Sequence, residues 1–160
     1  MIKYLRGVSE DSINEQVFRF LEGEWIVHRR FEGSYRGSFS GKACFASEAD
    51  TPSNYLYHEQ GELIDGENKR FDAKQSYLYR LTEGKLEVLK QDGSAWEAMH
   101  VLEFQKQEGI ATASHVHLCG DDHYATVYRV DLSRGWELSY TVNGPKKDYR
   151  IHTFYSRGTG

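Results

Sequence analysis

The sequence lacks the features that mark secreted, membrane-spanning and nucleic-acid-binding proteins. Its first residues, MIKYLRG, contain no apolar stretch of signal-peptide length. No segment approaches the roughly 20 apolar residues that a spanning helix needs. Basic residues are scattered, with no run longer than Lys146-Lys147, and the formal net charge is −4. Such a chain has no basic surface to attract nucleic acid or an anionic membrane, so we expect a cytoplasmic protein with neither partner.

Cysteine and proline are also scarce, at two residues each. Cys44 and Cys119 could form one disulfide, but a chain without an export signal more often keeps its thiols reduced. The 160 residues are enough for one domain with its own core, and no change of composition divides them. We expect a single domain over residues 1–160, as a monomer or a homodimer.

Aromatic residues are abundant, with 11 Tyr, 8 Phe and 3 Trp. They alternate with polar residues in short segments separated by Gly, Asn and Asp, which is typical of antiparallel strands joined by tight turns. The links leave no room for crossover helices, except that 64–74 is predicted to be a longer, mobile connection. We predict an all-β, up-and-down barrel over 23–157, with about ten strands at 25–32, 37–46, 54–63, 75–81, 85–91, 99–105, 110–118, 124–130, 136–142 and 149–157.

One helix is predicted before the barrel, over residues 9–21. Ser12 and Glu15 stand at capping-box spacing, and one apolar stripe runs along the segment before Gly23 ends it. The stripe consists of Ile13, Val17, Phe20 and Leu21. A helix this short is not stable alone, so we expect it to pack across one end of the barrel.

The predicted inner face of the barrel is too polar for a solid core. Arg29 shares its face with Trp25, and several tyrosines and histidines point the same way. A barrel of eight or more strands can hold a cavity, and this lining suits a small amphipathic or aromatic ligand. Alternatively, the tyrosines span the sheet and reach solvent with their hydroxyls. The predicted ligand-binding residues are Arg29, Tyr57, Tyr79, His117, Tyr124, Tyr128, Tyr140 and Lys147.

Two of these residues carry a positive charge. Arg29 or Lys147 is expected to meet an anionic group of the ligand. For Lys147, an alternative interpretation is a solvated hairpin tip in which the lysine pairs with an aspartate.

The segment HVHLCGDDH, residues 115–123, holds the densest chemistry in the chain. His115, His117 and Cys119 alternate onto one side of a strand, which makes them weak candidates for a metal site. Alternatively, His117 and Asp122 form a buried pair that supports the turn. The same two residues, with Tyr124 as proton donor, are the candidate acid/base set if the protein is an enzyme. We favour binding over catalysis.

Trp25 and Arg157 lie on the same face of the first and last predicted strands. In a closed barrel these strands are neighbours, so the guanidinium can stack on the indole. We interpret both residues as structural. The triplet Gly23-Glu24-Trp25, together with Arg157, resembles the calycin superfamily of lipocalins, fatty-acid-binding proteins and nitrobindin-like barrels.

A longer pattern is more specific than this triplet. It comprises LEGEW (21–25), GSFSG (37–41), HLCGDDHY (117–124) and GPKKDY (144–149). Together these segments resemble a bacterial and fungal domain family of unknown function with a calycin-like fold, over about residues 20–157. The resemblance implies a fold and no activity. Nitrobindin-like barrels ligate haem through one His, and the inner histidines available for this are His100, His115 and His117. Haem and metal therefore stay open as alternatives.

Overall fold

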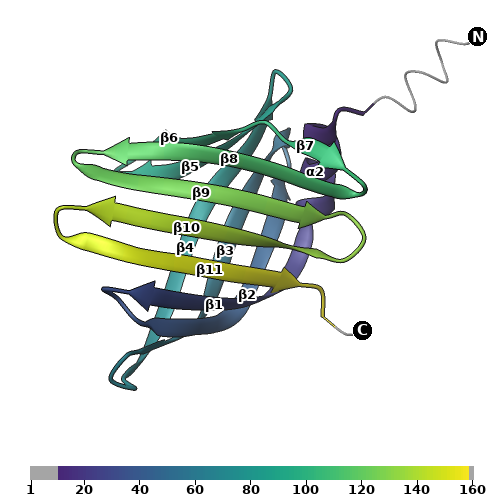
Figure 1. Ribbon diagram of the computed structural model, residues 1–160. Helices are drawn as coiled ribbons and strands as arrows, with labels where there is room; N and C mark the ends of the chain where they lie inside the picture. Colours follow the sequence, from purple (N-terminus) through teal and green to yellow (C-terminus); the bar gives the residue numbers. More distant parts are fainter. Residues whose placement is uncertain (1–10, 159–160) are drawn as a thin grey trace, which may run out of the picture.

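The structure, a computed structural model, describes residues 11–158. Within this range it contains one sheet of eleven antiparallel strands and one helix (Figure 1). The elements are α2 (Ile13–Leu21), β1 (Gly23–Gly33), β2 (Gly37–Glu48), β3 (Thr51–Asp65), β4 (Arg70–Thr82), β5 (Lys85–Asp92), β6 (Ala95–Leu102), β7 (Gln105–Gln107), β8 (Ile110–Cys119), β9 (Asp122–Asp131), β10 (Gly135–Gly144) and β11 (Lys147–Ser156).

The sheet curls into a barrel with up-and-down topology. Its strand order is β6-β5-β4-β3-β2-β1-β11-β10-β9-β8-β7, so the first and last strands pair in the middle of the sheet. The two outer parts of the sheet then meet, because β6 contacts β8 without a backbone ladder between them. We call this line of contact the seam. The predicted all-β, antiparallel, up-and-down architecture is confirmed.

Two details of the predicted strands are wrong. The segment 99–105 is divided: β6 ends at Leu102, and β7 begins at Gln105, because the Phe104 amide donates to the Asn14 side chain instead of to a strand (2.9 Å). The predicted long connection 64–74 is a tight turn. Asp65 ends β3, and its carboxylate accepts the amides of Glu67 and Lys69 (2.8 and 2.9 Å), which closes the turn over Gly66–Lys69.

The helix begins later than predicted. Ser12 is the N-cap, with extended backbone, and forms the predicted capping box with Glu15. Asp11 is not helical, and the predicted positions 9 and 10 lie outside the described residues. α2 lies at one end of the barrel (Figure 1), and the Asn14 side chain also donates to the carbonyl of Gly84 in the β4–β5 turn. No helix within residues 11–158 is long and apolar enough to cross a membrane.

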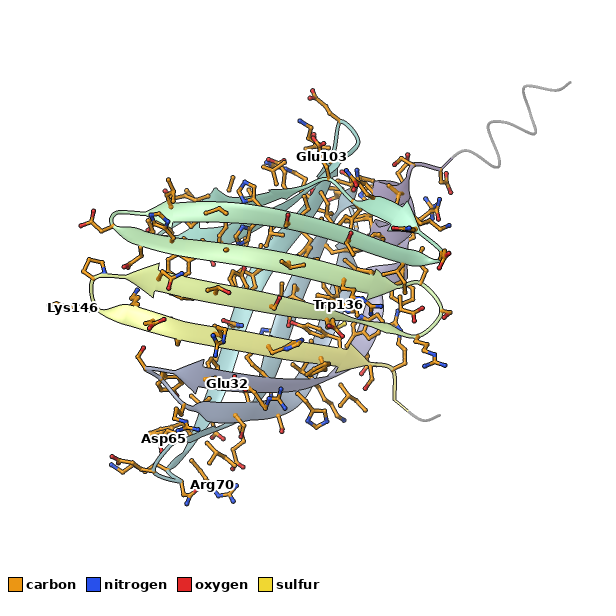
Figure 2. All side chains as sticks on the ribbon, viewed as in Figure 1. Glu32, Asp65, Arg70, Glu103, Trp136 and Lys146 are labelled. Atoms are coloured by element: carbon orange, nitrogen blue, oxygen red, sulfur yellow. The ribbon has the colours of Figure 1, made fainter. Side chains whose placement is uncertain are left out.

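The barrel has two different ends. The helix end holds a dense aromatic core, in which Trp136 stacks on Tyr155 at 3.7 Å and packs edge-on against Trp25. The opposite end, which we call the hairpin end, carries the turns at 34–36, 93–94, 120–121 and 145–146. Figure 2 shows Trp136 near the first end and Lys146 at the second. The apolar core therefore fills only part of the barrel interior.

Trp25 and Arg157 are in contact where the chain enters and leaves the barrel. The guanidinium lies 3.5 Å from the indole centroid and donates to the carbonyls of Phe20, Glu22 and Glu24 at 2.7, 3.0 and 2.9 Å. The first two carbonyls belong to the end of α2 and the link to β1, where helical acceptors lack intrahelical partners, and the third belongs to β1. One arginine thus joins the helix terminus, the first strand and the last strand.

Because Trp25 is 1% exposed, Trp25→Ala should lower the free energy of unfolding by about 3–5 kcal/mol. Arg157→Ala should be non-additive with it by at least about 0.5 kcal/mol, because each substitution removes the same stacking contact. Urea denaturation of the two single variants and the double variant measures this coupling. The exposed Arg134 is the matched control, and Arg134→Ala should change stability little. Strictly additive losses for Trp25 and Arg157 would contradict a shared contact.

Candidate functional site

A cavity of about 350 Å³ occupies the interior toward the hairpin end. Its wall combines aromatic rings with a smaller number of polar side chains, drawn from β1, β3, β4, β5, β6, β8, β9, β10 and β11. The lining residues are Arg29, Phe31, Tyr57, Gln75, Tyr77, Tyr79, Val88, Lys90, Met99, His100, His117, Cys119, Tyr124, Tyr128, Leu138, Tyr140, Val142, Tyr149, Ile151, Thr153 and Tyr155.

The structure brings seven of the eight predicted ligand-binding residues to this cavity. Only Lys147 is outside the lining. Its ammonium group lies 2.8 Å from the Tyr124 hydroxyl and 3.1 Å from Asp122, beside the hairpin end. Hydrogen bonds from these two partners, Tyr124 first, raise the pKa of Lys147 above its ordinary value. A role for any of the eight residues in binding a ligand stays a prediction.

Arg29 meets a carboxylate of the protein itself. Its guanidinium donates to both carboxylate oxygens of Glu59, at 2.6 and 2.9 Å, and to the Thr153 hydroxyl at 2.8 Å. Glu59 is 2% exposed and also accepts from Tyr57 and from Gln75 (3.0 Å). Burial alone would lower the pKa of Arg29, but the hydrogen bonds and negative charge of Glu59 raise it above its ordinary value. The two opposite charges therefore cancel, and the pair adds no net charge to the cavity wall.

The tyrosine hydroxyls are paired inside the wall and do not all reach solvent. Tyr79 and Tyr128 share a hydrogen bond of 2.7 Å, and Tyr57 and Tyr155 share one of 2.8 Å. All four residues are at most 4% exposed, and burial is the main cause that raises their pKa values above the ordinary range. These phenols stay protonated at neutral pH. The cavity thus presents mainly ring surfaces, with the hydroxyls satisfied among themselves.

A histidine cluster bridges the seam. His100 of β6 is fully buried, and its two ring nitrogens lie 3.0 Å from Nδ1 of His115 on β8 and 2.7 Å from the Tyr140 hydroxyl on β10. Burial, with smaller contributions from His115 and His117, lowers the pKa of His100 to about 3. The pKa of His115 is also lowered, mainly by burial. Neutral imidazoles can therefore hydrogen-bond across the gap that the backbone leaves open.

The chemistry predicted for residues 115–123 is arranged differently. His117 pairs in register with Tyr124, whereas Asp122 is opposite Cys119 and forms its ion pair with Lys147. Within residues 11–158 no hydrogen bond or ion pair joins His117 to Asp122, so neither the predicted structural pair nor the predicted acid/base pair is formed. Both cysteines are free thiols.

The metal candidates are not assembled either. The described range contains no group of three or more His, Cys, Asp or Glu side chains arranged to hold a metal ion. His115 instead turns its Nδ1 to His100, while His117 and Cys119 line the cavity. For haem, the inner histidines His100 and His115 are already engaged with one another, and no observation on the described residues singles out an axial ligand.

Four residues that shape this site were not among the eight predicted ligand-binding residues. Glu59 and His100 each have a partner on another strand, 30 and 15 residues away, so alternation along one strand does not reveal either pair. Gln75 was placed at the start of a strand and Met99 at the start of another, without an inward assignment. A bulge between Val88 and Leu89 shifts the β5–β6 register and turns Met99 toward the cavity. The alternation of polar and apolar residues carries no signal of this bulge.

Removing one partner of the buried ion pair should be costly. Glu59→Gln should lower the free energy of unfolding by about 3–5 kcal/mol, because the Arg29 charge is left without its carboxylate. The double variant Arg29→Met/Glu59→Leu should recover a large part of this loss. Glu62→Gln, in the exposed pair with Arg70, is the control and should cost about 1 kcal/mol or less. Chemical denaturation measures all three, and equal losses for Glu59→Gln and Glu62→Gln would contradict the role given to burial.

His100 should make stability depend on pH. The folded protein keeps its imidazole neutral down to about pH 3, whereas the unfolded chain binds a proton near pH 6.5. Its stabilising contribution is therefore complete above pH 6.5 and is lost as the pH falls, at up to about 1.4 kcal/mol per pH unit. Urea denaturation between pH 7 and 5 should show a shallower slope for His100→Gln than for the parent. His28→Gln, at an exposed position, is the matched control. An unchanged slope in His100→Gln would refute the role given to His100 in the pH dependence of stability.

Comparison with known proteins supports the fold and adds no activity. The chain resembles the protein in the crystal structure of Rv2717c from M. tuberculosis, with 14% sequence identity, a TM-score of 0.62, and coverage of 93% of this chain and 100% of that chain. At this identity the likeness concerns the fold alone. No curated protein matches the chain. A family model matches residues 21–157, from the end of α2 to Arg157, and the chain therefore belongs to DUF6314, a family of unknown function.

Proposed function

We propose that this protein binds a small aromatic or amphipathic molecule inside the barrel. The observation that carries the proposal is the cavity of about 350 Å³ in a barrel that is otherwise filled by a dense aromatic core. Closed protein interiors are packed with few voids larger than a water molecule. A cavity of this size falls at the lower end of the range for small-molecule sites, which corresponds to a molecule of two or three fused or linked rings.

The lining favours a ligand with ring surfaces and a polar edge. The alternative, that the tyrosines only span the sheet and reach solvent, does not account for Tyr79 and Tyr128, whose hydroxyls bond to each other in the interior. With those hydroxyls satisfied, an apolar ring can lie against the wall without stranding a buried polar group. The Tyr140 hydroxyl remains at the cavity surface beside His100 and offers a hydrogen bond to a polar edge.

Binding is preferred over catalysis in the same cavity. The acid/base interpretation depends on a carboxylate that orients His117, and Asp122 is engaged with Lys147 instead. Burial is the main cause of the pKa shifts of His100 and of the buried tyrosines, and it holds these groups neutral. These neutral groups of the wall, bonded to one another, support retention of a ligand and provide no activated nucleophile.

Fluorescence of the neutral dye N-phenyl-1-naphthylamine tests the proposal. The purified protein should enhance and saturate its emission, because the dye enters an aromatic, water-poor site. Ile151→Trp, which places a larger ring in the cavity, should weaken binding at least about tenfold, since overfilled sites lose shape complementarity. Val116→Trp adds the same ring on the exposed outer face and is the matched control. Equal binding by both variants, each checked for its fold by circular dichroism, would overturn the cavity as the site.

A further inference from the structure

The positive charges around the cavity are not equivalent. Arg29 is paired with Glu59 in the wall, and Lys147 is paired with Asp122 beside it. These were the two residues predicted to meet an anionic group of the ligand. Each already has a carboxylate within hydrogen-bond distance, and displacing that carboxylate would leave a second, unpaired charge behind. Neither residue is therefore the best partner for a ligand anion.

Lys90 is the remaining cation of the lining, and it lacks such a partner. It lies on β5, facing the cavity, and is half-buried. Among residues 11–158 no ion pair or side-chain hydrogen bond to Lys90 is formed. Its register partner on β6, Glu97, is exposed to solvent and does not form an ion pair with it. A half-buried ammonium group with free donors is a site for a negatively charged oxygen.

The sheet is interrupted next to Lys90. β4 pairs with β5 only through Leu78–Thr82, although β4 begins at Arg70. Figure 1 shows β4 crossing the barrel steeply while β5 follows β6. Gln75 and Tyr77, on the part of β4 that pairs with β3 but not with β5, line the cavity together with Lys90 of β5. The β4–β5 ladder therefore ends at the pair Leu78–Leu89, and Lys90 is the first residue of β5 beyond it.

We propose that the ligand is an aromatic monoanion whose acidic group is bound by Lys90, beside the end of the β4–β5 ladder. This inference rests on the proposed function and specifies the ligand class. The ring system lies deeper, against Met99 and the tyrosines, and the acidic oxygens remain near solvent, where their desolvation costs least. The internally neutral Arg29–Glu59 pair marks the deeper wall as a place for the uncharged part of the molecule.

Two dyes that share one skeleton test the charge directly. N-phenyl-1-naphthylamine is neutral, and 8-anilinonaphthalene-1-sulfonate carries one sulfonate on the same ring system. The parent protein should bind the sulfonate more tightly. Lys90→Met keeps most of the apolar stem and removes the charge, so it should weaken sulfonate binding about tenfold and leave the neutral dye within about twofold. Lys74→Met, at an exposed position of β4, should change neither affinity.

Two further measurements distinguish an electrostatic role of Lys90 from a purely structural one. Glu97→Gln removes the nearest carboxylate in the β5–β6 register and should strengthen sulfonate binding. Raising the salt concentration should weaken sulfonate binding to the parent but not to Lys90→Met, because screening acts only where the charge pair exists. A purely structural role for Lys90 would affect both dyes equally and would not depend on salt.

The possible failures are distinguishable. If Ile151→Trp leaves the binding of both dyes unchanged, the cavity is not the site and the proposed function is overturned together with this inference. If Ile151→Trp abolishes binding of the neutral dye but Lys90→Met binds the sulfonate as the parent does, the proposed function stands and the assignment of Lys90 is overturned.

Discussion

The pairing of β1 with β11 sets which side chains of these two strands point into the barrel. It joins the first and last strands in the middle of the sheet, and it places Arg29 opposite Thr153 and Val27 opposite Tyr155. Because strand register has a period of two, a slip of one residue would turn Arg29 out of the barrel. Arg157 holds this register at its end, through the carbonyls at the end of α2. The β1–β11 register therefore determines both that Arg29 points into the cavity and that Arg157 reaches the end of α2.

The two ends of the barrel interior are stabilised by different interactions. At the helix end, aromatic rings such as Trp25 and Trp136 fill the space by stacking and edge contacts. Toward the hairpin end, polar groups bond to one another across strands, as Arg29 does with Glu59 and His100 with His115. Such bonds satisfy buried groups without filling volume, because they run along the wall. This division leaves a cavity whose Arg29, Glu59 and His100 side chains all have hydrogen-bond partners.

Much of this arrangement was predictable from the alternation of apolar and polar residues along the strands. Trp25, Val27 and Arg29 share a face in the sequence, and the same face is inward in the structure. The connection 64–74 was not predictable, because Asp65 closes a turn whose surrounding residues are too polar to suggest paired strands. The predicted contact between His117 and Asp122 is not formed, for a related reason. Closeness in sequence across a turn does not decide which residues are opposite one another, and the β8–β9 register sets Cys119 against Asp122.

Local periodicity and turn chemistry are readable in the sequence, and they predict most of the strands, the capping box of the helix and seven residues of the cavity wall. Which charges are paired with one another depends instead on the three-dimensional arrangement of the strands. Glu59 reaches Arg29 from β3, two strands away, and Lys90 is left beside an interruption of the β4–β5 ladder. These outcomes depend on register, curvature and where a ladder stops. Such properties arise from many strands packing together, and no single segment encodes them.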